Sequence, residues 1–468
     1  MNRFLLHPAL VFLVSAALFP SRAISADTSI RSVSNQPAVT MKLSECIEKA
    51  LTTMPSLRSA RYDREAVEGQ LEQAKSAYFL PDIRLRVLGG VVPDVPAGSG
   101  PEGNFPSVNT GVMDLGPFIQ ARVEGIQPLY TFGKLSNLKQ AARRGVEAKE
   151  AQEQVVRAEI TRQVKKVYYG IVFLRSLEDF LNELKDRGNS AREKLQDLIR
   201  KHNPEVTEID LMRLDVFSAE AERNLIEAHN GANLGMATLG VLTGGMASPP
   251  VSPEDQSLLF NEIALKPLDY YLSRAAVARP ELRALDGMVR AKQALMRATK
   301  ADFFPSFFLG GYYNYGTAPG REHVDSPFLK DDFNINSGGG ALGMEQKLSF
   351  HMTGSRYDQV TADYRKAMAD RDQALLGIQL EIRKAYSDAM TKTASVKAAR
   401  EGFRAGRSWV TATTLNFSVN LVPIKDLLEA FVAYSRVKVG FLNTIQEFDM
   451  AITDLTRAVG EEAADVRG

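Results

Sequence analysis

Two carboxylates in the last quarter of the chain, Asp426 and Glu429, have the type and spacing that could carry chemistry. They lie three positions apart, just after residues 420–423, which read Asn-Leu-Val-Pro. Asparagine and proline in this arrangement are typical of a helix exit followed by a new helix. Both acids therefore fall in the first turns of a helix, where the helix dipole favours negative charge in any protein. By themselves they predict a helix start and no reaction.

A related arrangement occurs earlier in the chain, where residues 203–205 read Asn-Pro-Glu and Asp210 follows. Arg213 stands where the second acid would be. Charges three positions apart on a helix are neighbours, so this site can pair its charges locally.

Residue types that commonly catalyse reactions or bind metals are sparse. No histidine after the N-terminal segment has a second histidine four positions on, or a carboxylate in a ligand-like pattern; the four are His202, His229, His323 and His351. No glycine-rich phosphate loop stands between a strand and a helix, and the glycine run 338–340 is interpreted as a flexible loop. The sequence predicts no enzyme, no metal site and no cofactor.

Composition and the N-terminus indicate an exported protein without a charge bias. The 468 residues include 57 basic and 56 acidic ones, so net charge implies no attraction to nucleic acid or anionic lipid. Residues 1–26 are typical of a signal peptide, with Arg3 before an apolar run and Ala23 and Ala26 as cleavage sites. Because Cys46 is the single cysteine, the chain cannot form an intrachain disulfide, and Cys46 is expected to take part in helix packing.

The chain repeats itself with a spacing of about 220 residues, which is an architectural signal. Pro55-Ser-Leu-Arg recurs as Pro280-Glu-Leu-Arg, and the segment ending at Pro81 recurs as one ending at Pro305. We divide the chain into a signal peptide (1–26), a first structural repeat (27–245), a connector (246–266), a second structural repeat (267–460) and a C-terminal tail (461–468).

Each repeat is predicted to begin with a helix and to continue as two strands. In the first, residues 43–80 are helix-like and Pro81 ends the helix. Apolar and charged residues then alternate in 83–87 and 119–124, and the second repeat has the counterparts 307–315 and 342–349. Gly- and Pro-rich loops at about 93–117 and 317–337 separate the strands. One apolar and one charged face suits a strand with lipid on one side and water on the other.

Nothing beyond the signal peptide approaches 18 consecutive apolar residues. An exported chain of this kind that enters a membrane is therefore expected to form a closed barrel, because only helices and closed barrels satisfy all backbone hydrogen bonds in hydrocarbon. Four strands cannot enclose a lumen, so several chains must share one barrel.

Two long helical hairpins complete the repeats. Apolar residues recur at steps of three and four from Ile160 to Leu198, and again from Leu375 to Phe417. A helix from near Gly133 to near Lys201 would be roughly 100 Å long. The return helices keep the heptad pattern up to about Leu239 and Val459. These rods favour coiled-coil packing over a globular core.

In order, spacing and duplication these features resemble the TolC family of outer membrane efflux channels. The segments that carry the resemblance are Met54-Pro-Ser-Leu, the strand exit Gln127-Pro-Leu-Tyr-Thr-Phe-Gly, and the tip Phe417-Ser-Val-Asn with the acids after it. The resemblance implies a mainly α fold with long α-helical hairpins that form a periplasmic α-barrel. It also implies a homotrimer in which four β-strands per chain close a 12-stranded membrane β-barrel.

The resemblance implies a passive outer membrane channel of a tripartite efflux or type I secretion system. Its partners would be a periplasmic adapter and an inner-membrane pump, and it would lie in outer membrane lipid with its tunnel in the periplasm. Asp426 and Glu429 match the family's acidic ring at the periplasmic gate, with Asp210 as a further candidate. The hairpin tips that would contact the adapter are Asn203, Pro204, Asn420, Leu421 and Val422.

One alternative stays open at this point. An exported coiled-coil structural or adhesin-like protein without a pore would show the same heptads, with its strands in a soluble subdomain. Such a protein would be water-soluble and would not conduct ions, whereas a channel would need detergent for extraction and would open pores in planar bilayers.

Overall fold

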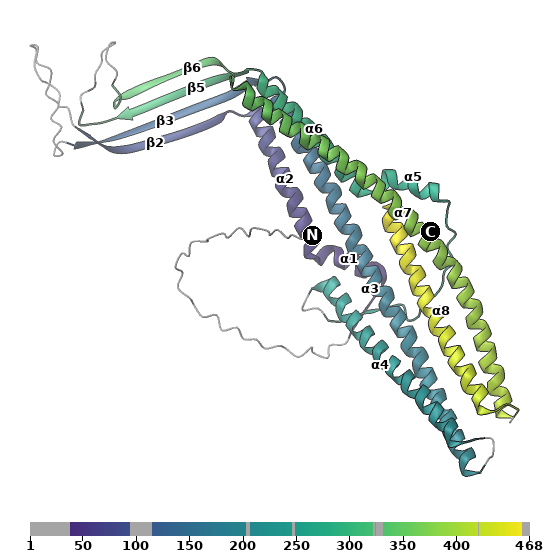
Figure 1. Cartoon of the computed structure of the whole chain (residues 1–468). Coiled ribbons are helices and arrows are strands. Elements are labelled where there is room, and N and C mark those ends of the chain that lie inside the picture. Colours follow the sequence, from purple (N-terminus) through teal and green to yellow (C-terminus); the bar gives the residue numbers. More distant parts are fainter. Residues whose placement is uncertain are drawn as a thin grey trace, which may run out of the picture. The chain divides into compact units, whose positions relative to one another are not determined.

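The computed structural model describes residues 38–93, 115–202, 206–245, 249–321, 323, 331–419 and 421–460, all within the compact unit Ala38–Gly468. Its helices are α1 (Leu43–Thr53), α2 (Pro55–Phe79), α3 (Lys134–Arg200), α4 (Glu208–Gly244), α5 (Leu268–Ala278), α6 (Pro280–Lys300), α7 (Phe350–Ser418) and α8 (Ile424–Val459), with a 3-10 turn at Ala301–Phe303 (Figure 1). Its strands are β1 (Val39–Met41), β2 (Asp82–Pro93), β3 (Leu115–Tyr130), β4 (Val251–Pro253), β5 (Ser306–Thr317) and β6 (Ile335–Glu345).

Both halves of the chain follow one order: short helix, helix, two strands, long helix and return helix. The long helices α3 and α7 contain 67 and 69 residues, which corresponds to roughly 100 Å each at 1.5 Å per residue. The mainly α fold with four longer strands, expected from the heptads and the alternating segments, is confirmed.

The predicted single helix over 43–80 is wrong, because the chain breaks at Met54. This residue is extended, with φ −63° and ψ 123°, and Pro55 starts α2 as its first residue. The second half has the same break, where Arg279 is extended and Pro280 starts α6. Proline disfavours the helical conformation in the residue before it, so each proline both ends one helix and begins the next.

The four long strands form one antiparallel sheet in the order β2-β3-β5-β6. The two repeats join at β3 and β5, and β2 and β6 are the open edges. The interpretation of residues 338–340 as a loop is wrong, since they lie inside β6. A Cβ on Gly338 would lie 3.2 Å from the Tyr313 ring, and one on Gly339 would lie 3.2 Å from the Tyr312 ring. Aromatic rings on β5 thus cover glycines of the neighbouring strand, which stabilises such a strand.

The predicted strand at 342–349 also extends too far toward the C-terminus. β6 stops at Glu345, and Leu348 lies outside it, in the short connection to α7.

The helices pack as one layer. α3 contacts α2 and α4 on one side and α6 and α8 on the other, and α7 contacts α6 and α8. The order across the layer is therefore α2 with α4, then α3, then α6 with α8, then α7. No described helix combines the length and the apolar composition that crossing a membrane requires.

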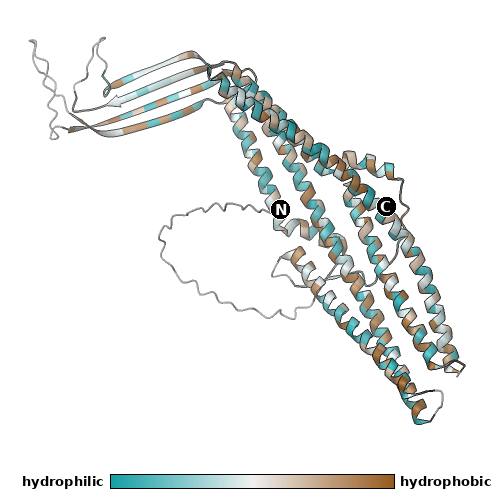
Figure 2. Ribbon diagram, in the orientation of Figure 1, coloured by the Kyte–Doolittle hydropathy of each residue, from teal (hydrophilic) through white to brown (hydrophobic). Residues whose placement is uncertain are grey.

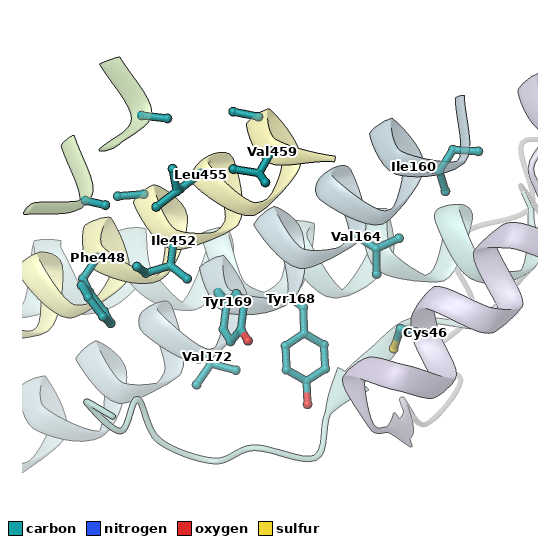
Figure 3. Close-up of a cluster of buried hydrophobic side chains, with 14 of the residues drawn as sticks. Cys46, Ile160, Val164, Tyr168, Tyr169, Val172, Phe448, Ile452, Leu455 and Val459 are labelled. Carbon is teal, nitrogen blue, oxygen red and sulfur yellow. The ribbon is translucent and has the colours of Figure 1, made fainter. Parts of the chain in front are cut away.

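Short helices and strands pack against the middle of the long helices. β1 pairs in parallel with β4, which lies in the connector between the repeats. Cys46 of α1 is fully buried close to Val164 and Tyr168 of α3, and Figure 3 shows these side chains together with the apolar residues of α8. The Tyr168 hydroxyl donates to Asp255 Oδ2 at 3.0 Å. The prediction that Cys46 takes part in helix packing is confirmed.

Candidate functional site

The two hairpin ends pack against each other. Their common apolar cluster contains residues from both repeats: Leu195, Val206 and Leu214 from the first, and Phe417, Ile424 and Leu427 from the second. Because the heptads of α3, α4, α7 and α8 all continue to these ends, the two turns are held side by side. The sequence elements that flank the turns are thereby placed at one end of the helical layer (Figure 1).

Asp426 and Glu429 lie in the first turns of α8, and both side chains are exposed. The apolar residues between and after them, Leu427 and Ala430, are buried against the hairpins. No basic group lies within ion-pair distance of either acid in the described part of the chain. The structure thus brings the two predicted residues together as a pair of free, solvent-facing carboxylates.

Asp210 occupies the matching place on α4 but has a different environment. Its side chain is 11% exposed, and its Oδ2 accepts hydrogen bonds from the Thr207 amide at 3.1 Å and from the Thr207 hydroxyl at 2.9 Å. Its Oδ1 accepts from Arg213 Nη1 at 3.2 Å. Both oxygens are engaged in a capping box and an ion pair. The pairing with Arg213 expected from the sequence is present.

The predicted tip residues fall partly outside the described residues, namely Asn203, Pro204 and Asn420. Leu421 is 73% exposed, and Val422 packs partly buried against the tip cluster. Val419, which the sequence analysis did not select, is 63% exposed just before the turn. Two exposed apolar side chains therefore flank the second turn; Val419 lies in the tip segment 417–420 that carries the family resemblance, which is the signal that points to it.

One face of the sheet is apolar and exposed to its surroundings. The strand register places side chains of all four strands on this face: Ile83, Leu85, Val87, Val91, Ile119, Val123, Leu309, Tyr313, Tyr315, Leu342 and Met344. Figure 2 shows the alternation of apolar and polar residues along the strands. Such a continuous exposed apolar patch on a four-stranded sheet is typical of a surface that contacts a membrane or another protein.

The opposite face of the sheet is polar. It carries Arg84 and Arg86 on β2, Arg122 and Glu124 on β3, and Asn314 on β5. A sheet with one lipid-like and one hydrated face is what the alternating segments of the sequence predicted. These polar-face residues were not predicted as a site, because which of them lie opposite one another depends on the pairing of the strands.

The described residues contain no group of three or more His, Cys, Asp or Glu that could hold a metal ion. His229 lies on the surface of the first hairpin, with Nδ1 2.9 Å from Glu178 Oε1 and Nε2 2.9 Å from Asn233 Nδ2. Trp409 is 46% exposed on α7. The described residues thus offer charged surfaces and apolar faces for association.

Comparisons with known proteins agree with this picture. Residues 271–461 match the family model of the outer membrane efflux proteins. The outer membrane protein VceC of Vibrio cholerae has a TM-score of 0.70 at 17% identity, over 90% of this chain and 96% of that chain. The CmeC outer membrane channel of Campylobacter jejuni has a TM-score of 0.69 at 16% identity, over 96% of both chains. The MtrE outer membrane channel of Neisseria gonorrhoeae, in its open state, has a TM-score of 0.70 at 17% identity, over 90% of this chain and 89% of that chain.

A comparison with curated protein sequences gave no match. The family match covers the second repeat, and the similarity of fold extends over nearly the whole described chain. Residues 271–461 are therefore similar to the outer membrane efflux proteins, and the described chain has the fold of the solved outer membrane channels.

Proposed function

We propose that three copies of the protein form the outer membrane channel of a tripartite efflux or type I secretion system. The channel conducts passively: an inner-membrane pump delivers solutes through a periplasmic adapter, and the channel releases them outside. The strands of three chains close a barrel in the outer membrane, and the helices continue it as a tunnel in the periplasm. The family match and the fold shared with the CmeC and MtrE channels support this proposal.

The observation that carries the proposal is that the sheet and the helical layer end on the same two flanks of the chain. One flank consists of the β2 edge together with α2 and α4, since β2 directly follows α2. The other consists of the β6 edge together with α7, since α7 directly follows β6. An unpaired strand edge in hydrocarbon costs several kcal/mol for each free backbone group, so neighbouring copies must pair β2 with β6.

The helical flanks have apolar surfaces that suit the same association. On α4 the exposed large apolar residues are Ile209, Met212, Val216, Ile226, Leu234 and Val241. On α7 they include Leu376, Leu380, Met390 and Leu415. Contact between α4 of one copy and α7 of the next buries both sets and extends the helical layer around a closed tunnel.

We further propose that Asp426 and Glu429 form the acidic ring at the periplasmic mouth. Three copies would place six carboxylates around one opening, which raises the local concentration of cations. Asp210 contributes little to this ring, because Arg213 and Thr207 engage both of its oxygens. The tip residues, with Leu421 and Val422 among them, form the surface that receives the adapter.

Association is tested with charged substitutions on one flank. Leu376→Asp and Leu380→Asp together should prevent trimer formation, measured by native mass spectrometry in detergent, because each places a charge in the contact between α7 and the neighbouring α4. Leu259→Asp changes an equally exposed residue of the connector, outside both flanks, and should leave the trimer intact. A trimer that survives the double substitution would refute this interface.

The channel itself is tested in planar lipid bilayers with the purified full chain. Discrete conductance steps are expected, and their absence would exclude the channel function. Replacing Asp426 and Glu429 with alanine should weaken the preference for cations and the block by divalent cations; unchanged selectivity would remove these two acids from the gate. Crosslinking in cells followed by purification should recover an adapter and an inner-membrane pump.

A further inference from the structure

The polar face of the sheet carries three arginines with unequal partners. Arg84 Nη2 lies 2.8 Å from Asp82 Oδ2, and Arg122 Nε lies 2.5 Å from Glu124 Oε1. No carboxylate lies within ion-pair distance of Arg86 among the residues that the structure describes. Arg86 is exposed in the middle of β2, so it is a cation that none of the acids described by the structure neutralises through an ion pair.

The strand register places Arg86 in a row without acids. Arg86 is opposite Arg122, Arg122 is opposite Asn314 on β5, and Asn314 is opposite Ser337 on β6. Two guanidinium groups and two neutral polar side chains thus span all four strands at one level. Like charges on directly opposed positions destabilise a sheet, so this pair is not explained by stability of the fold.

The acids of the same face lie closer to its helical end. Asp82 begins β2, Glu124 is one row nearer to the helices than Arg122, and Glu345 ends β6. Charge is therefore separated along the strands, with carboxylates toward the helices and an excess of guanidinium in the next row. Arg86 and Arg122 also line one hollow of about 300 Å³, in which Asp332 is the one acidic residue among those described.

We propose that Arg86, with Arg122 beside it, forms a cationic band in the barrel lumen that favours the passage of organic anions carrying carboxylate or phosphate groups. This inference rests on the proposed trimeric channel, because the polar face lines the lumen only in a closed barrel. Three copies place six guanidinium groups at one level. Arginine keeps its charge at every physiological pH and binds carboxylate or phosphate through two parallel hydrogen bonds.

The band has the opposite charge to the proposed acidic mouth. A solute would first pass Asp426 and Glu429 at the periplasmic end and then the guanidinium row between the strands. Rings of charged side chains set ion preference in channels, and lumen substitutions in barrels tune selectivity. The preference of the channel for cations or anions is therefore set by both rings together, and removing one ring should shift it toward the ions that the other ring attracts.

The first experiment measures reversal potentials of the full-length channel across a potassium chloride gradient. Arg86→Glu should shift the permeability ratio toward potassium, and Arg86→Lys, which keeps the charge, should behave like the parent. A change in local potential of about 1 kT alters the ratio of anion to cation by roughly sevenfold. The shift should shrink at 1 M salt, where the Debye length falls from about 10 Å to about 3 Å.

The second experiment separates selectivity from folding. Arg86→Cys and its neighbour Leu85→Cys place a thiol on the polar and on the apolar face in turn, and the native Cys46 is buried. After the channel has assembled in the bilayer, water-soluble thiosulfonate reagents add a negative or a positive group to each thiol. Only the channel with Cys at position 86 should react, with the negative reagent favouring potassium and the positive reagent restoring the parent ratio.

The outcomes distinguish the inference from the function on which it rests. Conductance with a permeability ratio that neither Arg86→Glu nor modification of Arg86→Cys changes would overturn the cationic band and leave the channel standing. Reaction at position 85 instead of 86 would reverse the assignment of the two faces and also overturn it. A parent protein that forms no pores would refute the proposed function itself.

Discussion

The guanidinium of Arg279 donates from Nη2 to Glu381 Oε2 at 2.6 Å and so ties the start of α6 to α7. The side chain is 3% exposed, and it also donates to Glu281 at 3.1 Å and to the carbonyl oxygen of Ala458 at the end of α8 at 3.1 Å. One arginine therefore joins α6, α7 and α8 at the position where α6 begins and α8 ends.

Replacing Arg279 with methionine should destabilise the chain by about 2 kcal/mol, because the change removes charged hydrogen bonds to partly exposed Glu281 and Glu381 and the donor to the Ala458 carbonyl oxygen. The value is at the lower end for such changes, since Arg457 continues to face Glu381. The midpoint of thermal unfolding, followed by far-ultraviolet circular dichroism, measures the effect. Arg404→Ala removes an exposed pair with Glu401 and should cost about 0.5 kcal/mol or less. Equal losses for the two variants would contradict a special role of Arg279.

Cys46 makes stability depend on pH in the alkaline range. Burial, and then the charge of Glu45, raise the pKa of the Cys46 thiol from 9.0 to about 11. The folded chain therefore holds its proton between about pH 9 and pH 11, whereas the unfolded chain releases it. The stabilisation that the protonated thiol gives the folded chain is fully present below pH 9. Each pH unit between 9 and 11 lowers the free energy of unfolding by about 1.4 kcal/mol.

Thermal midpoints of the parent and of Cys46→Ala test this dependence. The parent should exceed the variant at pH 8, where the thiol packs as a small apolar group, and the advantage should shrink steadily by pH 11. A difference between the two proteins that stays constant over this range would show that Cys46 does not titrate as its burial requires.

Asp210 and Asp426 begin equivalent helices but should respond differently to substitution. Asp210→Ala removes the acceptor of the Thr207 capping box and leaves Arg213 unpaired, and it should cost about 1 to 2 kcal/mol. Asp426→Ala changes an exposed acid that has no side-chain partner among the described residues, and it should change stability by about 0.5 kcal/mol or less. Chemical denaturation of the detergent-solubilised chain compares the two variants. A larger loss of stability for Asp426→Ala than for Asp210→Ala would contradict the capping role of Asp210.

The sequence allowed the long helices and the repeat to be predicted because their signals are local and sustained. A heptad seam of several turns fixes the hairpins, and proline at the start of α2 and α6 recurs in both halves. The break at Met54 was missed because the apolar pattern continues across it. The residues 338–340 were assigned to a loop because glycine has no side chain to show a period of two, and Tyr312 and Tyr313 that cover them lie on another strand.

The same difference between local and long-range signals applies to the candidate site residues. The position of Asp426 and Glu429 at a helix start and the pairing of Asp210 with Arg213 depend on neighbours within one helical turn, so the sequence sufficed to predict them. The row of Arg86 and Arg122 could not be predicted in this way. It depends on the register between β2 and β3, which is set by the backbone pairing of strands separated by more than 20 residues.

Gly287 sets the distance between α3 and α6. A Cβ at this position would lie 2.9 Å from the Ala148 Cβ and 3.1 Å from its Cα and backbone nitrogen, so the two helix backbones would have to separate. Gly287→Ala should therefore destabilise the chain by about 1 to 3 kcal/mol, as overpacked contacts do. Gly170→Ala is the matched control, because a Cβ there meets nothing within 4 Å and removes a flexible residue from the interior of α3. That change should stabilise the chain by about 0.5 to 1 kcal/mol.

Adding Ala148→Gly to the Gly287→Ala variant isolates the contact. The double variant removes one of the two clashing methyl groups while the backbone contacts of Ala148 remain, so part of the lost stability should return. Thermal unfolding of the four proteins gives the coupling energy between the two positions. Losses that simply add would mean that α3 and α6 do not meet at this point, and a neutral Gly287→Ala would mean that the helices can shift apart without cost.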